Sequence, residues 1–335
     1  MYEGTCTKAA VPYSRTRVHS YAGSLKVMEI APMRAHGIIV ALHTPLTPSG
    51  EIHEDALCDH LEWMVQAGVH GIFPCGTMGE GIALSDAQRK RVTEIAVAQV
   101  KGRAFVMPQV TTNNTAGCSE LSRHAEVAGA DAISVIAPYF YPSDGAALEA
   151  FFTEVAASVP DLPVFLYNNP GRSASGISSG VVGKLVKKVK NIAGIKDSSK
   201  DLILFQEYVE VGGDGFACII GTDGLVYPAM MVGGVGVVSA VANPFPELMV
   251  ALYDAVLAKQ YERARKLQLL VNQLRVVLKI GPYLAGYKEI MRLRGRRFPL
   301  DMKAPLRGLN EKETVEIRAA FESLPKEVFD PAPVK

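Results

Sequence analysis

The segment Asn191-Ile192-Ala193-Gly194-Ile195-Lys196-Asp197-Ser198-Ser199 places a lysine at the end of a short apolar run. Apolar residues that lead into Asp-Ser-Ser, a sequence that favours a helix start, predict a buried strand ending at Lys196. Free lysine has a pKa of about 10.4, but apolar surroundings favour its neutral amine. A neutral amine can attack a ketone and form a Schiff base. The alternative is a lysine that reaches solvent or pairs with Asp197.

The same alternation of an apolar run and a helical segment occurs eight times between Gly37 and Ala258. The apolar runs are Gly37–Leu42, Gly71–Cys75, Phe105–Pro108, Ala132–Ile136, Val164–Tyr167, Ile192–Lys196, Phe216–Ile220 and Val235–Ala240. Strands that are apolar throughout and joined by helices predict a parallel sheet covered on its outer face. Eight such units predict an α/β fold of the (β/α)8 TIM-barrel type, with a doubly wound open sheet as the alternative.

The chain divides into three predicted parts. Residues 1–35 carry basic residues among Ser, Thr and Tyr without a clear period. They are expected to be a non-catalytic extension whose role is left open. It could be a transit segment, an ordered arm on a partner subunit, or residues upstream of a true start at Met28 or Met33. Residues 36–258 form the catalytic barrel. Residues 259–335 form a C-terminal helical appendix of about three helices, which would cover the barrel or build an oligomer contact.

Composition excludes several classes of function. The net charge of +1 and the dispersed basic residues give no support for nucleic acid or a membrane surface as a partner. The five cysteines are far apart without a Cys-x-x-Cys pair, which favours a reducing cytosol over a disulfide framework. Scattered histidines predict no metal site. Gly234-x-Gly236 lacks a third glycine, so no dinucleotide cofactor is expected.

In such a barrel, reactive groups lie at the carboxyl ends of the strands. Thr77 stands between Gly76 and Gly79, where a tight turn can aim backbone N–H groups at a carboxylate. The alternative is a turn that only connects two elements. Tyr167 ends the strand before the lysine strand, so its phenol can exchange protons with the imine unless it is a packed aromatic. Arg172 can pair with a substrate carboxylate, although most loop arginines are solvated.

Four segments together resemble the dihydrodipicolinate synthase and N-acetylneuraminate lyase (DapA-like) family. They are Gly76-Thr77-Met78-Gly79-Glu80, Pro138-Tyr139-Phe140-Tyr141-Pro142, Tyr167-Asn168-Asn169-Pro170-Gly171-Arg172 and Gly194-Ile195-Lys196-Asp197-Ser198. The resemblance covers roughly Gly37 to Leu324. It implies a class I lyase with pyruvate or a 2-keto acid as substrate, assembled as a homotetramer of paired dimers.

The resemblance also implies a role for individual residues. Lys196 forms the Schiff base, Tyr167 donates and accepts protons, and Thr77 links Tyr167 to a hydroxyl relay. Substrate-binding positions follow from the same motifs: the backbone of Met78 and Gly79 for the pyruvate carboxylate, with Arg172, Gly221 and Val238 along the site.

Two positions depart from the family pattern. Met78 replaces a hydroxyl residue, so one side-chain hydrogen bond to the carboxylate is lost. Phe140 stands where synthases carry a tyrosine that is donated across the dimer, and a phenylalanine cannot relay a proton. Loss of one acid-base partner can cost about 10²- to 10⁴-fold in rate. Tyr139 or Tyr141 can compensate.

The substrate indications conflict. Arg172 resembles the residue by which synthases hold aspartate semialdehyde, whereas Tyr141-Pro142 resembles the 2-keto-3-deoxy sugar acid aldolases. Asp86 and Arg89 replace the histidines of lysine-inhibited synthases, so feedback control by lysine is not expected. We expect an aldolase of the 2-keto-3-deoxy sugar acid type acting on an anionic aldehyde. The alternatives are 4-hydroxy-tetrahydrodipicolinate synthase, a dehydratase on the same imine, a non-catalytic keto-acid-binding protein and a phosphate-binding barrel isomerase.

Overall fold

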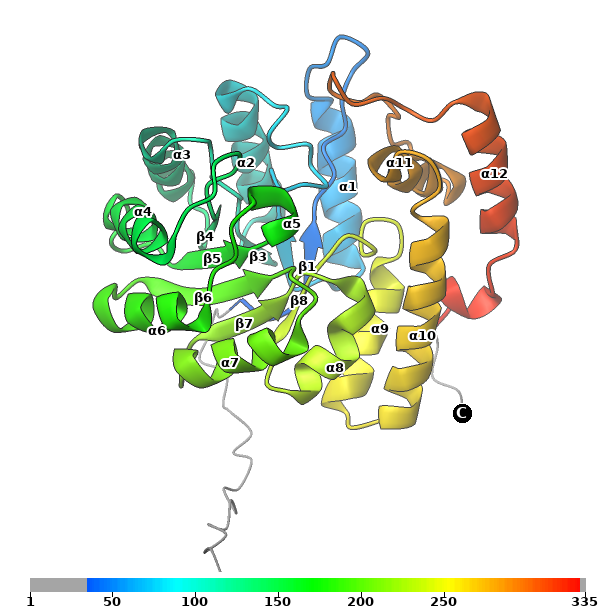
Figure 1. The fold of residues 1–335 in the computed structure, drawn as a ribbon. Coiled ribbons are helices and arrows are strands. Elements are labelled where there is room, and N and C mark those ends of the chain that lie inside the picture. Colours follow the sequence, from blue (N-terminus) through cyan, green and yellow to red (C-terminus); the bar gives the residue numbers. More distant parts are fainter. Residues whose placement is uncertain (1–34, 332–335) are drawn as a thin grey trace, which may run out of the picture. The chain divides into compact units, whose positions relative to one another are not determined.

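The computed structural model describes residues 35–331 and contains one sheet of eight parallel strands (Figure 1). The strands are β1 (Gly37–Ala41), β2 (Gly71–Phe73), β3 (Phe105–Val106), β4 (Ile133–Ile136), β5 (Val164–Asn168), β6 (Ile192–Asp197), β7 (Ala217–Ile220) and β8 (Gly236–Ser239). Strand β1 pairs with both β2 and β8. The Ser134 N–H donates to Pro108 O at 2.9 Å, and Ser134 O accepts from the Val110 N–H at 3.0 Å, which joins β4 to the chain after β3. The sheet is therefore a closed barrel, and a doubly wound open sheet is excluded.

A ring of helices covers the outer face of the barrel (Figure 1). They are α1 (Glu54–Gln66), α2 (Asp86–Val100), α3 (Thr115–Val127), α4 (Gly145–Ala157), α6 (Ser179–Lys188), α7 (Leu202–Gly212), α8 (Val226–Met231) and α9 (Pro246–Leu257). Ser85 begins α2 with a capping box, in which its hydroxyl accepts from the Gln88 N–H and the Gln88 side chain accepts from the Ser85 N–H. The short helix α5 (Pro170–Ser173), which the sequence did not indicate, occupies the loop after β5.

The glycine in the middle of β6 allows the lysine strand to pack closely against its neighbours. A methyl group on Gly194 would lie 2.3 Å from the ring of Phe165 and 2.4 Å from Ala217 O. Residues Gly194 to Asp197 are all buried, as expected for a parallel strand with helices outside and other side chains inside. The tight packing fixes the position from which Lys196 extends.

Three further helices follow the barrel: α10 (Tyr261–Val277), α11 (Tyr283–Leu293) and α12 (Glu311–Glu322). Helix α10 packs against α9 and against the short 3₁₀ turn after β7, and α12 packs against α11. They stand together beside the barrel (Figure 1). The predicted N-terminal extension lies outside the described residues, except for Ala35. No helix in residues 35–331 is long and apolar enough to cross a membrane.

A buried ion pair ties the loop after β2 to the C-terminal helices. Lys288 of α11 and Glu80 have fully buried side chains, with 2.6 Å between Nζ and Oε1. Lys288 Nζ also donates to Asp301 O at 2.6 Å, and the Lys303 N–H donates to Glu80 Oε2 at 2.7 Å. Breaking a buried pair by removing one partner costs several kcal/mol, because the other charge stays buried without compensation. This pair therefore holds the Gly76–Glu80 loop in place.

We predict that Lys288→Met lowers the free energy of unfolding by about 3–5 kcal/mol, measured by urea denaturation. Arg265 forms an exposed pair with Glu262 on α10, so Arg265→Met is the matched control and should cost about 1 kcal/mol or less. The double change Glu80→Gln with Lys288→Met should recover part of the loss. Equal stability of Lys288→Met and the control would contradict this role of the pair.

Candidate active site

A cavity of about 680 Å³ opens at the carboxyl ends of the strands. Most of the residues singled out in the sequence line it, namely Lys196, Tyr167, Thr77, Met78, Arg172, Gly221 and Val238. They come from the ends of β2, β5, β6, β7 and β8 or from the loops that follow them. The closed barrel brings these strand ends together, as in other barrels of this type.

The amine of Lys196 lies between two aromatic rings. Lys196 is paired with Tyr167 of β5 on one side and with Ile219 of β7 on the other. Only 4% of the Lys196 surface is exposed. Its Nζ lies 3.8 Å from the centroid of the Tyr167 ring and 4.0 Å from that of Phe73. It forms no ion pair with a described residue. Aromatic faces attract an ammonium group, but they replace water only in part.

Asp197, the alternative partner of Lys196, is held by other groups. Its carboxylate accepts from Asn168 Nδ2 at 2.7 Å and from the Ser199 hydroxyl at 2.8 Å. Successive side chains of a strand point to opposite faces, so Lys196 faces the barrel interior and Asp197 faces away from it. The lysine and this aspartate therefore do not pair.

The environment shifts the pKa values of Lys196 and Tyr167. Burial lowers the pKa of Lys196 from its ordinary value, against the opposing effects of Tyr167 and Asp223. Burial alone would raise the pKa of Tyr167, but the nearby Lys196 charge and hydrogen bonds from Asn169 and Ser198 lower its pKa overall. The amine therefore loses its proton more readily than an ordinary lysine, and the phenol loses its proton more readily while that amine carries its charge.

Asn169 rather than Thr77 contacts the phenol. Asn169 Nδ2 donates to the Tyr167 hydroxyl at 2.9 Å. Thr77 lines the same cavity, but within residues 35–331 its hydroxyl makes no hydrogen bond. The expected link from Thr77 to Tyr167 is thus not formed in this structure. Asn169 lies in one of the four motifs, but its contact with the phenol was not predicted.

The turn after β2 is fixed by close backbone packing. Gly79 O accepts from the Thr44 hydroxyl at 2.8 Å, and a methyl group on Gly79 would lie 2.8 Å from Leu42 O. The backbone N–H groups of Met78 and Gly79 donate to no other described residue. Met78 itself is 6% exposed and lines the cavity. Unpaired N–H groups at a fixed turn can bind an anion.

Arg172 reaches the C-terminal helices. Its guanidinium Nη2 donates to the Tyr283 hydroxyl at 2.9 Å, and Cζ lies 5.9 Å from the centroid of the same ring. Arg172 is exposed, and Tyr283 at the start of α11 also lines the cavity. The arginine is therefore available to a ligand while one of its donors is already used.

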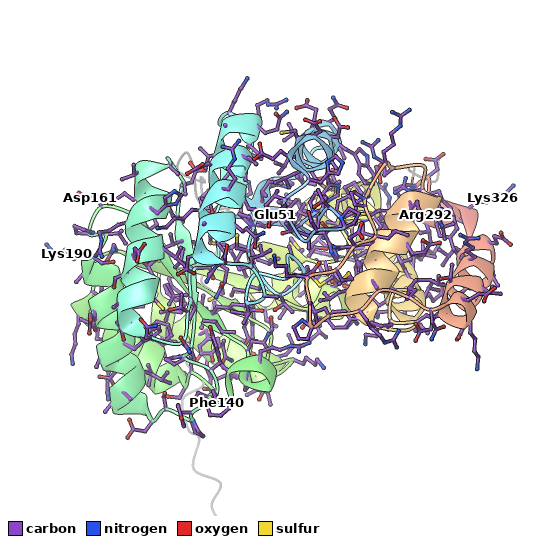
Figure 2. All side chains as sticks on the ribbon, turned by 90° about the horizontal axis from the view of Figure 1, so that it is seen from above. Glu51, Phe140, Asp161, Lys190, Arg292 and Lys326 are labelled. Atoms are coloured by element: carbon purple, nitrogen blue, oxygen red, sulfur yellow. The ribbon has the colours of Figure 1, made fainter. Side chains whose placement is uncertain are left out.

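The three candidates for a proton relay, Tyr139, Phe140 and Tyr141, differ in where they lie. Tyr139 lines a second cavity of about 440 Å³, whose wall also includes Thr77, Tyr167 and Arg172. Phe140 and Tyr141 are 80% and 75% exposed and contact each other edge to face, with Phe140 at the edge of the molecule in Figure 2. Neither Phe140 nor Tyr141 lines either of the two cavities.

Several lining residues had no role predicted from the sequence. Asn169, Ser198, Arg275, Lys279 and Tyr283 all line the cavity that holds Lys196. The described part of the chain contains no group of three or more His, Cys, Asp or Glu side chains arranged to hold a metal ion. Arg89, by contrast, is buried and donates to the carbonyl oxygens of Gln109 and Thr111, which gives it a structural role.

Comparisons with known proteins agree with this geometry. A family model described as the Dihydrodipicolinate synthetase family matches residues 34–324. A protein named an uncharacterized DapA-like lyase from Halobacterium salinarum is 37% identical over 294 residues, 88% of this chain and 95% of the relative. The 4-hydroxy-tetrahydrodipicolinate synthase of Methanopyrus kandleri is 40% identical over 232 residues, 69% of this chain and 77% of that enzyme.

Solved structures give the same result. Dihydrodipicolinate synthase DapA-2 from Bacillus anthracis has a TM-score of 0.82 at 30% identity and covers 87% of this chain and 98% of its own. A prophage protein of E. coli K12, belonging to the dihydrodipicolinic acid synthase family and solved in complex with pyruvate, has a TM-score of 0.83 at 28% identity. It covers 86% of this chain and 98% of its own.

We predict that Lys196 reacts with cyanate, which modifies neutral amines, with a midpoint below pH 10.5. A lowered pKa leaves more neutral amine at any given pH, so labelling begins at lower pH than for an ordinary lysine. Tyr167→Phe removes an interaction that raises the pKa of Lys196, so its midpoint should fall further. Peptide mapping across a pH series gives both midpoints. A midpoint at or above 10.5, or an upward shift in Tyr167→Phe, would contradict the environment described here.

Proposed function

We propose that this chain, which belongs to the dihydrodipicolinate synthetase family, forms a Schiff base between Lys196 and pyruvate or another 2-keto acid. A C–C bond to an aldehyde is then made or broken on this intermediate. The observation that carries the proposal is the buried amine of Lys196, held 3.8 Å from the Tyr167 ring centroid without an ion-pair partner among the described residues. A lysine in this setting loses its proton more readily than an exposed lysine, which makes its amine a better nucleophile.

The first half of the reaction forms the imine. The carboxylate of the keto acid binds to the backbone N–H groups of Met78 and Gly79. The Lys196 nitrogen attacks the ketone carbon, and the carbonyl oxygen takes up a proton to give a carbinolamine. Tyr167 donates the proton with which this hydroxyl leaves as water, and the C=N bond forms. Asn169 orients the phenol through the hydrogen bond to its oxygen.

The second half uses the imine as an electron sink. Tyr167, now a phenolate, removes a proton from the carbon next to the imine, which gives an enamine. The enamine carbon attacks the aldehyde carbon, and the aldehyde oxygen takes up the proton. Water then hydrolyses the imine, which releases the product and regenerates the Lys196 amine. In the cleavage direction the same steps run in reverse order.

The substrate that we favour is a 2-keto-3-deoxy acid of the sugar acid type. Tyr141-Pro142 and the replacement of the synthase tyrosine by Phe140 support this class. Condensation of pyruvate with aspartate semialdehyde is the second candidate, supported by Arg172 and by relatives named 4-hydroxy-tetrahydrodipicolinate synthase. A keto-acid-binding protein without turnover is the third, supported by Met78 and Phe140 at altered relay positions.

We also propose a homotetramer of paired dimers that acts in the cytoplasm. The exposed pair Phe140 and Tyr141 supports a subunit contact at this edge, because large exposed aromatics are typical of interfaces. The four cysteines in the described residues are all free, which supports a reducing compartment.

Borohydride reduction in the presence of pyruvate is predicted to leave a stable adduct on Lys196, detected by intact mass and peptide mapping. Lys196→Ala should give none, whereas Lys190→Ala, at an exposed lysine (Figure 2), should behave as the wild type. Tyr167→Phe should slow exchange of the pyruvate methyl protons in D₂O by about 10²- to 10⁴-fold. Wild-type turnover in Lys196→Ala would overturn the proposal, and an adduct without proton exchange would favour the binding protein.

An aldehyde screen separates the two enzymatic candidates. We expect kcat/KM to be higher with hydroxylated sugar-type aldehydes than with aspartate semialdehyde, because Phe140 lacks the proton relay of the synthases. Phe140→Tyr should raise turnover with aspartate semialdehyde more than with sugar-type aldehydes, since it restores that relay. Higher kcat/KM with aspartate semialdehyde in the wild type would favour the synthase. Unchanged rates in Phe140→Tyr with both aldehydes would mean that the proton takes another path.

A further inference from the structure

The wall of the cavity that holds Lys196 is strongly basic. Arg172, Lys200, Arg275 and Lys279 line it together with Lys196, whereas Asp223 is the single acidic side chain among the described lining residues. Arg275 and Lys279 come from α10 and the segment after it, outside the eight barrel units. An excess of positive charge over one wall of a cavity attracts an anionic ligand.

Asp223 does not neutralise this wall by an ion pair. Its carboxylate accepts from the Ser239 hydroxyl at 2.5 Å and from the Ala240 N–H at 3.3 Å, which holds it against the end of β8. It forms no salt bridge with any cation in residues 35–331. Arg275 acts on Asp223 only through space, and this one carboxylate faces five basic side chains, so most of their charge is left for a ligand.

Arg275 is the best placed of these residues. It is half-buried, and within the described part of the chain its guanidinium makes no hydrogen bond and no ion pair. A methyl group on Gly224, in the turn after β7, would lie 2.1 Å from Arg275 Nη1, so the guanidinium rests directly on this glycine. A guanidinium has five donors in a planar fork that matches a carboxylate or a phosphate. A half-buried arginine whose donors bond to no described residue is well suited to bind an anion.

The same turn relates Arg275 to the reactive lysine. A methyl group on Gly221 would lie 3.2 Å from Lys196 Cε, whereas Gly224 contacts Arg275. Three residues of chain span at most about 11 Å, and this stretch is shortened because it enters a 3₁₀ turn. A chain of a few carbons attached through its keto carbon to Lys196 can therefore extend along Gly221–Gly224 towards Arg275.

We propose that Arg275, supported by Lys279 and Lys200, binds a second anionic group at the far end of the substrate. The substrate class is then a 2-keto acid whose carbon chain ends in a carboxylate or a phosphate. This inference rests on the proposed Schiff-base chemistry and narrows its substrate. Arg172 is a separate contact, because it stands on the loop after β5 and one of its donors already binds Tyr283.

A matched pair of ligands tests the subsite: 2-oxoadipate and 2-oxohexanoate have the same length and differ in the terminal carboxylate. Borohydride trapping on Lys196 is measured at increasing concentration of each. In the wild type, half-maximal trapping should require at least about tenfold less 2-oxoadipate, the effect expected of a hydrogen bond between charged groups. Arg275→Met should reduce this ratio to near one while still forming the adduct with 2-oxohexanoate.

Control variants separate Arg275 from general charge effects. Arg265→Met, on the exposed surface of α10, should keep the wild-type ratio. Gly224→Ala displaces the guanidinium without removing it and should lower the preference for 2-oxoadipate over 2-oxohexanoate. Arg172→Met should keep most of this preference. Inorganic phosphate that competes with 2-oxoadipate in the wild type, but not in Arg275→Met, would assign a phosphate ester as the natural end group; without competition, the end group is a carboxylate.

Two results would overturn the subsite. One is a ratio near one in the wild type, and the other is a ratio that Arg172→Met abolishes but Arg275→Met preserves. Both presuppose trapping on Lys196, so they leave the Schiff-base proposal intact. Failure of pyruvate itself to form the adduct would instead contradict the proposed function.

Discussion

The structure accommodates one unusual group, a lysine amine enclosed by the rings of Phe73 and Tyr167. Moving a charged amine out of water is costly, and a carboxylate partner would restore the charge. The nearby carboxylates are engaged elsewhere: Asp197 by Asn168 and Ser199, and Asp223 by Ser239. The closed barrel thus favours the neutral, nucleophilic form of Lys196 in two ways. It places aromatic rings beside the amine, and it leaves the amine without a carboxylate partner.

The C-terminal helices shape the site as much as the barrel does. Lys288 of α11 holds Glu80, and with it the turn that presents the Met78 and Gly79 amides. Tyr283, at the start of the same helix, binds Arg172. Arg275 of α10 rests on the turn after β7. Packing of the appendix therefore fixes the three loops around the reactive lysine.

The lining of the cavity combines two sets of groups. One set is the backbone donors of the turn after β2 and the Lys196 amine, which the proposed reaction uses at the keto acid. The other set is basic: Arg172 and Lys200 stand on loops of the barrel, and Arg275 and Lys279 belong to α10 and the segment after it. The first set can serve the proposed chemistry while the second set selects the substrate. We infer that substrate choice in this chain lies with Arg172 and Arg275 rather than with Lys196.

The sequence by itself determined the eight strand-helix units, the family and the lyase class, and all three are confirmed. Uniformly apolar strands and the short motifs around Thr77, Tyr167 and Lys196 are local signals that can be read along the chain. Tertiary structure alone decided that Asn169 contacts the phenol, that Arg172 bonds to Tyr283 although 111 positions separate them, and that Phe140 is exposed outside the cavity. No periodicity encodes such contacts, because they depend on how the loops and the C-terminal helices pack over the barrel.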